Sequence, residues 1–268
     1  MALVFCAIVP HSPLLIPTIA KGKASSLAQS IMAMQVIAKR LAASRAETII
    51  VLINHALDQA NAVEAISFNI NSHYQANFEE FGDYGMSYNV SGDLAIGQRL
   101  KHRFDTMREY RPIMVTSKDK LDGNISSSLF YIIKNRPSIK LVPIHDTINS
   151  ERPEFSIGTK LRRPIYQDKS RVALIASINL SHRLNELSPA GYSARAKKFD
   201  KRVLAAVIKK TPTVLNRIKP ETLTDVQECA LRPLQLMMGV LQDTFYTPEI
   251  LSYECPLGIG HAVIHLNF

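Results

Sequence analysis

The sequence predicts an α/β fold in which helices cover both faces of a sheet. Short apolar runs alternate along the chain with longer segments of helical periodicity. The runs at residues 3–9 and 48–53 are apolar almost without a break, as strands covered on both faces require. No internal repeat, low-complexity tract or linker divides the 268 residues, so we expect a single domain over residues 1–268.

In the first half of the chain, the spacing of apolar residues predicts three strands and two helices. Residues 25–44 are Ala-rich with apolar side chains at helical spacing, and residues 65–70 alternate apolar and polar side chains as an edge strand does. Residues 74–88, rich in Asn, Glu, Gly and aromatic side chains, indicate an irregular loop. The elements in order are a strand at 3–9, a helix at 25–44, strands at 48–53 and 65–70, the loop, and a helix at 94–109.

The second half of the chain continues the alternation and closes with two strands. Pro233 suits the first turn of a helix that ends near residue 241, and Lys209 and Lys210 suit the negative end of a helix over 192–210. Residues 146–168 contain two prolines and receive no assignment. The remaining predicted elements are a helix at 125–135 and strands at 139–144, 172–178, 250–253 and 262–266.

The composition narrows the class of protein. No apolar stretch approaches the roughly 18 residues of a membrane span, and we expect the run at 3–9 to be a first strand rather than a signal peptide. Three cysteines without regular spacing argue against a disulfide framework and indicate a reducing, cytoplasmic setting. The net charge is +9, but the basic residues are scattered pairs, which favours a solvated basic surface over a nucleic-acid-binding module.

Two histidines follow predicted core strands. His11 lies between Pro10 and Pro13, where the prolines stiffen the backbone and hold the imidazole in a defined direction. His55 leaves the second strand in the same way. If the two strands are neighbours, as the single helix between them suggests, both imidazoles emerge at one edge of the sheet. The alternative is that both are loop histidines that only hydrogen-bond nearby groups.

Two further side chains are candidates for chemistry at this edge. His182 ends a segment in which Ser177, Asn179 and Ser181 alternate with apolar residues, and it is a base, a further ligand or a loop histidine. Glu228 precedes a strongly apolar helix. A carboxylate there is either a metal ligand, which with two imidazoles makes the donor set of a non-haem iron(II) site, or a first-turn acid favoured by the helix dipole.

Two other histidines are secondary candidates, and several common motifs are absent. His145 follows a predicted strand, and His261 follows glycines that permit close backbone approach. The sequence contains no GxGxxG strand–turn–helix unit, no GxxxxGK[ST] phosphate loop and no GxSxG elbow. The absence of the GxGxxG unit argues against a dinucleotide-binding fold.

Six segments, in order along nearly the whole chain, match a known family. They are IVPHSPLL at 8–15, FEEFGD at 78–83, ASINLSHRL at 176–184, PAGYS at 189–193, ECALRP at 228–233 and SYECPLGIG at 252–260. Through them the chain resembles the class III extradiol ring-cleavage dioxygenase superfamily, which also contains the Memo-like proteins. Within it, the chain is most similar to the group called AmmeMemoRadiSam system protein B.

The resemblance implies a three-layer α/β/α fold around a central mixed sheet, together with a metal site. In the dioxygenases of this superfamily two histidines and a glutamate hold iron(II), roles that fall here on His11, His55 and Glu228. The acid/base histidine of the family falls on His182. The implied activity is extradiol cleavage of a catecholic ring with O₂, and the implied cofactor is Fe(II), with Zn(II) or another divalent metal as the alternative.

Two departures from the family pattern bear on this activity. Where the family commonly has Asp-His-Gly, this chain has Asp122-Gly123-Asn124, so a histidine that usually lines the substrate pocket is absent. Asn54 stands where a proline is frequent. The first departure favours the alternative of a Memo-like metal-binding protein without ring cleavage. As partners we expect a small aromatic substrate and O₂, neither nucleic acid nor a membrane, and a symmetric homodimer as the default assembly.

Overall fold

The structure, a computed structural model, describes residues 2–55, 66–106, 113–134, 136, 138–146 and 154–268. In this part of the chain, ten strands form one mixed sheet. The strands are β1 (Leu3–Val9), β2 (Thr48–Ile53), β3 (Ile66–Asn69), β4 (His73–Phe78), β5 (Asp83–Gly92), β6 (Ile113–Thr116), β7 (Lys140–Asp146), β8 (Val172–Ser177), β9 (Thr247–Glu254) and β10 (His261–Asn267). Their order is β4-β5-β7-β2-β8-β1-β10-β9, with β3 paired to β7 and β6 paired to β3.

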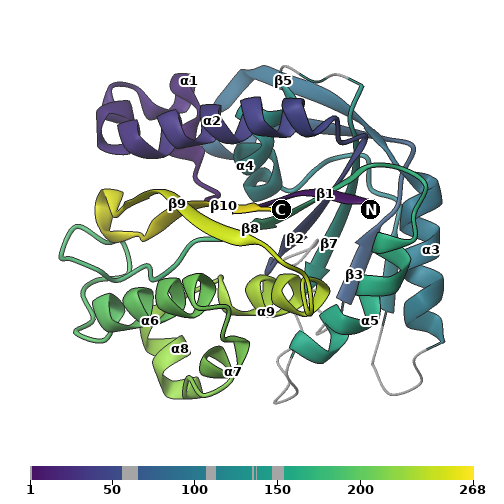
Figure 1. Ribbon diagram of the computed structural model, residues 1–268. Coiled ribbons are helices and arrows are strands. Elements are labelled where there is room, and N and C mark those ends of the chain that lie inside the picture. The colour runs from purple at the N-terminus through teal and green to yellow at the C-terminus, as the bar shows by residue number, and fades with distance from the viewer. Residues whose placement is uncertain (1, 56–65, 107–112, 135, 137, 147–153) are drawn as a thin grey trace.

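Helices cover both faces of this sheet (Figure 1). On one face lie α2 (Ala28–Ser44) and α4 (Gly123–Ile133), and on the other lie α3 (Leu94–Asp105), α5 (Glu154–Tyr166), α6 (Ala196–Ile208) and α9 (Leu231–Val240). Short helices α1 (Pro17–Ala20), α7 (Pro212–Leu215) and α8 (Pro220–Val226) complete the layers. The predicted three-layer α/β/α fold around a mixed sheet is therefore confirmed.

The side chains of β2 explain why its sequence is continuously apolar. Ile49, Val51 and Ile53 pack into the core that contains α2 and α4. Ile50 and Leu52 point to the opposite face and pack into the core that contains α5 and α9. Because successive side chains of a strand alternate between faces, a strand between two helical layers needs apolar residues at every position.

Four parallel strands occupy the centre of the sheet in the order β7, β2, β8, β1. The prediction that the strands at 3–9 and 48–53 are neighbours is wrong, because β8 lies between them. All four strands nevertheless run in the same direction, so residues that follow them emerge together. We call this end of the sheet the carboxyl edge, and it carries His11 and His55 after β1 and β2.

The predicted loop at 74–88 is wrong, because this segment is part of an antiparallel hairpin formed by β4 and β5. Tyr74, Ala76 and Phe78 are buried and alternate with more exposed residues, which is the strand signal that the polar composition obscured. Gly82 has a φ of +78° between the two strands, a conformation that glycine adopts without strain.

Other predicted elements match the structure with shifts at their ends. The unassigned segment contains α5, and the predicted first turn for Pro233 in α9 is confirmed. Strand β6 and helices α7 and α8 were not predicted. Parts of the predicted elements and of the unassigned segment lie outside the described residues, namely 65, 107–109, 135 and 147–153.

Helices α5 and α9 pack closely because each has a glycine where they cross. A Cβ atom at Gly158 would overlap the carbonyl oxygen of Leu236, and one at Gly239 would overlap the carbonyl oxygen of Phe155. This contact sets the position of α9 beside the sheet. It therefore also sets the position of the turn that precedes α9, residues 227–230.

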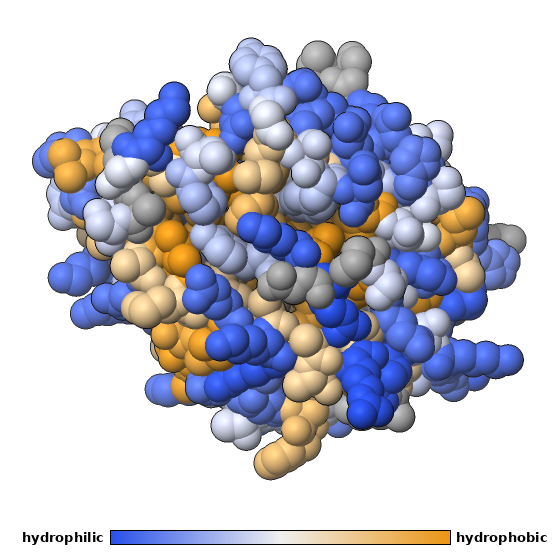
Figure 2. Space-filling view, turned by 90° about the horizontal axis from the view of Figure 1, so that it is seen from above, coloured by the Kyte–Doolittle hydropathy of each residue, from blue (hydrophilic) through white to orange (hydrophobic). Residues whose placement is uncertain are grey.

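No helix within the described ranges is both long enough and apolar enough to cross a membrane. The face that carries α1 and α2 is mostly hydrophilic, with small hydrophobic patches between charged side chains (Figure 2).

Candidate metal centre

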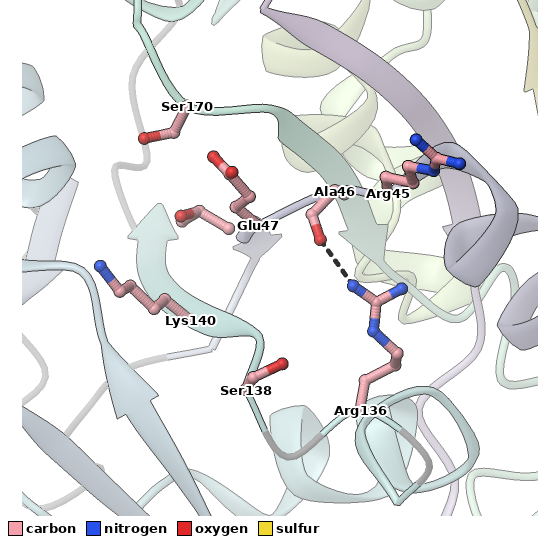
Figure 3. A pocket seen from close by; sticks show the side chains of 8 residues that line it. Arg45, Ala46, Glu47, Arg136, Ser138, Lys140 and Ser170 are labelled. Carbon is pink, nitrogen blue, oxygen red and sulfur yellow. Dashed lines mark hydrogen bonds between the residues drawn. The ribbon is translucent and has the colours of Figure 1, made fainter.

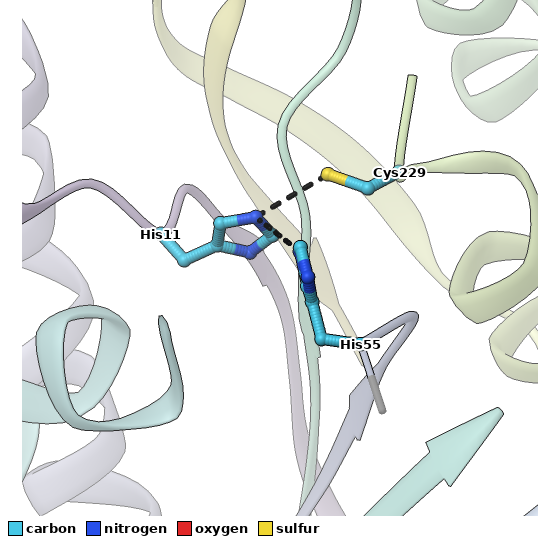
Figure 4. Close-up of side chains that lie close together, drawn as sticks. All are labelled: His11, His55 and Cys229. Atoms are coloured by element: carbon cyan, nitrogen blue, oxygen red, sulfur yellow. Dashed lines mark hydrogen bonds between the residues drawn. The ribbon is translucent and has the colours of Figure 1, made fainter. Parts of the chain in front are cut away.

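Two imidazoles and one thiol meet at the carboxyl edge. The Nε2 atoms of His11 and His55 are 3.2 Å apart, and their ring planes are inclined by 81°. Cys229, in the turn between α8 and α9, places Sγ 3.3 Å from Nε2 of His11. The three side chains point toward one another (Figure 4). Their candidate ligand atoms all lie within 4.8 Å of one another, and imidazole nitrogen with thiolate sulfur is a donor set that suits a single transition-metal ion.

His11 is held from two sides. The Asn179 side chain donates Nδ2–H to the His11 carbonyl oxygen at 2.7 Å, and its Oδ1 accepts the His11 backbone N–H at 3.3 Å. The ring Nδ1 lies 3.2 Å from Oγ of Ser177, the last residue of β8. When Nδ1 donates to this hydroxyl, the Nε2 lone pair is left facing His55 and Cys229, which is the tautomer that a metal ligand needs.

His145, a secondary candidate in the sequence, supports His55. It lies in β7, where it pairs with Ile53 of β2. Its Nδ1 donates to the carbonyl oxygen of His55 at 2.8 Å, so Nε2 of the neutral ring carries the lone pair. This Nε2 is buried and has no hydrogen-bond partner among the described residues. An orphaned buried nitrogen beside the His11–His55 pair is consistent with a ligand site.

Burial keeps the imidazoles of this edge neutral. It is the main cause that lowers the pKa of His11 well below its usual value, and the nearby His55, His182 and His261 lower it further. Burial also lowers the pKa of His55, although Asp122 opposes this effect. Neutral imidazole is the form that binds metal ions, so the electrostatic environment favours ligation.

Cys229 is a candidate donor that the sequence did not predict. Its Sγ accepts the Asn179 backbone N–H at 3.2 Å, so Asn179 contacts both His11 and Cys229. Burial raises the pKa of the Cys229 thiol, and the thiol becomes a strong ligand only when it gives up its proton. The signal in the sequence was a cysteine directly beside the proposed carboxylate ligand.

Glu228 is next to Cys229, but its carboxylate makes different contacts. Oε2 accepts the backbone N–H groups of Ala230 and Leu231 at 2.5 and 2.7 Å, which caps the start of α9. The three converging side chains do not include it. Residues 227–230 form a turn, with a φ of +52° at Gln227, so consecutive side chains can point in different directions. These contacts match the first-turn acid alternative, and the ligand role stays a prediction.

His182 also lies near His11 and His55, and its ring interacts electrostatically with both of them. Its backbone N–H donates to the carbonyl oxygen of Val226 at 3.0 Å. Burial lowers the pKa of the half-buried ring, and the Gln227 backbone opposes this effect. The ring Nδ1 is buried and has no hydrogen-bond partner within the described part of the chain.

His261, the other secondary candidate, reaches the same edge from β10. Strand β10 runs antiparallel to β1 with Ile264 opposite Ile8, which brings the first residue of β10 level with the end of β1. Both ring nitrogens of His261 are buried without a partner in the described structure. Burial, followed by the nearby His182, lowers the pKa of His261 to about 3. Several histidine ring nitrogens at the carboxyl edge therefore have no hydrogen-bond partner in the described structure.

At Gly123, where the family commonly has a histidine, another side chain occupies the adjacent space. Gly123 is the first residue of α4, and a Cβ atom there would overlap Oε1 of Glu80. Asp122 caps this helix by accepting the Asn124 backbone N–H at 2.8 Å. The Glu80 carboxyl group thus occupies the space in which the side chain of a histidine at position 123 would begin.

A pocket at the opposite end of the sheet has a different character. It has a volume of about 360 Å³ and lies at the amino ends of β2 and β7, which we call the amino edge (Figure 3). Arg136 donates to the carbonyl oxygens of Ala42 and Ala46 at 3.3 and 2.9 Å. Glu47 accepts the backbone N–H of Arg171 at 3.0 Å. These charged groups hold chain segments together, so this pocket is a weaker candidate site.

Comparisons with known proteins agree with the family resemblance and with the fold. A family model described as the catalytic LigB subunit of aromatic ring-opening dioxygenase matches residues 5–263. Protein CA_C1420 of Clostridium acetobutylicum is 26% identical over 271 residues, which cover 97% of this chain and 56% of that protein. The chain thus spans little more than half the length of this curated relative.

One solved structure shares the architecture. It is described as uncharacterized protein JW3007 from Escherichia coli K12, and it matches with a TM-score of 0.64 at 17% sequence identity. The match covers 98% of this chain and 100% of that one. At this level of identity the likeness shows the fold alone.

Proposed function

The chain belongs to the family of the catalytic LigB subunit of aromatic ring-opening dioxygenases, and from this we propose that it binds a divalent metal through His11 and His55 and uses O₂ to open a catecholic ring. The observation that carries the proposal is the convergence of two neutral imidazoles, buried at His11 and partly buried at His55, with Nε2 atoms 3.2 Å apart, at the carboxyl edge of an α/β sheet. Ligand sites of such sheets lie at this edge.

The proposed metal is Fe(II), with Zn(II) or another divalent cation as the alternative. Cys229 is the third donor in the observed arrangement, and Glu228 becomes the third donor if its carboxylate leaves the start of α9. Two imidazoles with a carboxylate are typical of iron(II) oxygenases, whereas imidazole with thiolate also suits zinc. When bound, the metal would act as a Lewis acid toward a catechol hydroxyl and transfer electron density from substrate to O₂.

The protein's own side chains would move the protons. We assign His182 as the base that accepts the proton of the second catechol hydroxyl at Nδ1, the ring nitrogen without a partner in the described structure. Burial lowers its pKa, so the ring is neutral near pH 7 and keeps the lone pair that a base needs. The same residue would return the proton later in the reaction. Ser177 and Asn179 would orient His11 throughout.

Oxygen uptake by anaerobically purified, Fe(II)-loaded protein tests this function with a panel of catechols. We expect His182→Gln to lower kcat by about 100-fold or more while metal content stays at the wild-type level, because general base catalysis contributes at least that much. His73→Gln removes an exposed histidine and is the matched control. Wild-type turnover in His182→Gln would show that the base is wrongly assigned.

A second candidate function is a Memo-like metal-binding protein without ring cleavage. Two observations favour it: Cys229 rather than Glu228 faces His11, and Glu80 occupies the space beside Gly123. Metal titration of Cys229→Ser and Glu228→Gln identifies the third donor, because only the true ligand should change the stoichiometry strongly. Metal-loaded protein that consumes no O₂ with any catechol would support this second function and exclude the first.

A further inference from the structure

A basic pocket lies apart from the histidine cluster and shares no residue with it. It has a volume of about 280 Å³ and is formed by α6 and the segment that leads from α7 into α8. Five of its eight lining residues are cationic, and none is acidic. These cations are Arg195, Lys198, Arg202, Arg217 and Lys219.

The fold does not neutralise these charges. Within the described ranges, none of the five forms an ion pair with a carboxylate, and Arg202 alone has a side-chain hydrogen bond, to the carbonyl oxygen of Val214 at 2.9 Å. Lys198 and Arg202 are four residues apart on α6, where like charges destabilise a helix. A concentration of positive charge in a concave surface attracts anions.

The floor of the pocket is apolar. Phe199 and Ile218 are only 3% and 7% exposed and lie between the cationic walls. The Thr222 side chain adds a neutral polar group to the lining. Arginine presents a planar fork of donors that matches phosphate oxygens, and three arginines are present here.

We propose that this pocket binds a small phosphorylated molecule, with its phosphate among the five cations and an apolar portion on Phe199 and Ile218. The volume is near the lower end for small-molecule sites, so a compact ligand is indicated. The pocket at the amino edge is larger but carries no such inference, because Glu47 lies among its cations and Arg136 is hydrogen-bonded to the backbone.

Calorimetric titration of the full chain with phenyl phosphate tests the proposal, because this probe combines one phosphate with one apolar ring. Metal-free protein is used at constant ionic strength, so the outcome is independent of the function proposed for the histidine cluster. We expect Lys198→Gln with Arg217→Gln to weaken binding by about tenfold or more, since it removes two charged donors. Lys39→Gln with Lys160→Gln removes two exposed cations elsewhere and is the control for net charge.

Separate titrations with inorganic phosphate and with phenol measure how much the phosphate group and the apolar ring each contribute to binding. We expect phosphate to bind more weakly than phenyl phosphate and phenol not to bind measurably. Equal losses in the two double variants, or no binding of phenyl phosphate at millimolar concentration, would overturn the proposal. It would also be overturned if a single-stranded oligonucleotide bound more tightly and lost affinity equally in both double variants. Unfolding temperatures of both double variants confirm that the fold is retained.

Discussion

Polar side chains differ in exposure and hydrogen bonding between the two edges of the sheet. At the amino edge, Arg136 and Glu47 are charged, partly or fully exposed, and hydrogen-bonded to backbone groups of neighbouring segments. At the carboxyl edge, His145 and His261 are buried and neutral and keep ring nitrogens without partners in the described structure. Buried polar atoms are normally satisfied because leaving one unpaired costs about 1–3 kcal/mol.

The contrast predicts which substitutions change stability and which change binding. Polar groups of the amino edge contribute to the fold, so their removal should change the free energy of unfolding. Ring nitrogens of the carboxyl edge lack partners in the described structure, so we expect removal of these histidines to change binding more than folding. Substitutions at both edges test whether polar groups serve mainly stability at the amino edge and mainly binding at the carboxyl edge. The first has the largest expected effect on binding.

His11→Ala should abolish stoichiometric metal binding. The substitution removes the imidazole that contacts both His55 and Cys229, so we expect affinity to fall by more than about 100-fold, beyond the effect of losing an outer-sphere contact. Metal analysis after dialysis against a weak chelator measures this. His102→Ala, at an exposed position of α3, is the control. Stoichiometric metal in His11→Ala would refute the site.

Asp200 should make stability decline as pH rises from about 4 to about 6. The carboxyl group accepts hydrogen bonds from the Ser181 backbone at 2.9 Å and the Tyr253 hydroxyl at 2.7 Å, yet burial raises its pKa from 3.8 to about 6. The folded state therefore binds the proton more tightly than the unfolded state, and this contribution, at most about 3 kcal/mol, is lost as pH rises through 6.

Urea denaturation of wild type and Asp200→Asn at several pH values checks this prediction. The difference in free energy of unfolding between the two proteins should change across the window, because the amide does not titrate. A constant difference from pH 4 to pH 7 would show that the carboxyl group has an ordinary pKa. Asp200 also differs from the charged groups of the amino edge, because it is buried and lies near the carboxyl edge.

Ser177→Ala should weaken metal binding by about tenfold without a comparable loss of stability. The hydroxyl lies 3.2 Å from Nδ1 of His11, and when it accepts a hydrogen bond from Nδ1, the lone pair of Nε2 faces the cluster. Zinc titration with a competing indicator measures the affinity. Ser128→Ala is the control, because this buried hydroxyl donates to the carbonyl oxygen of Ile125 within α4. Unchanged affinity would show that Ser177 does not orient the ligand.

Arg136→Met should have the smallest effect and the opposite pattern. It removes two hydrogen bonds to the carbonyl oxygens of Ala42 and Ala46 at the end of α2, so the free energy of unfolding should fall by about 1 kcal/mol. Metal affinity should stay at the wild-type value. A change in metal affinity would show that stability and metal binding are not divided between the two edges.

The strand ends were predictable from the sequence, but the position of Cys229 beside His11 was not. A continuous apolar run marks β2, and the histidine that follows it must leave at a strand end. By contrast, the apolar pattern after Glu228 suggests that Cys229 lies on a helix beside it, where neighbours do not face each other. The structure places both residues in a turn, and this lets the thiol face His11 while the carboxylate caps α9.

By itself, the sequence determined the layered fold and the positions of the candidate histidines, because apolar periodicity and strand ends are local properties of the chain. The tertiary structure was needed to place β8 between β1 and β2, Ser177 beside Nδ1 of His11 and Cys229 beside Nε2 of His11. The reason is separation along the chain: Asn179 and Cys229 contact His11 across 168 and 218 residues, and no local pattern encodes such contacts.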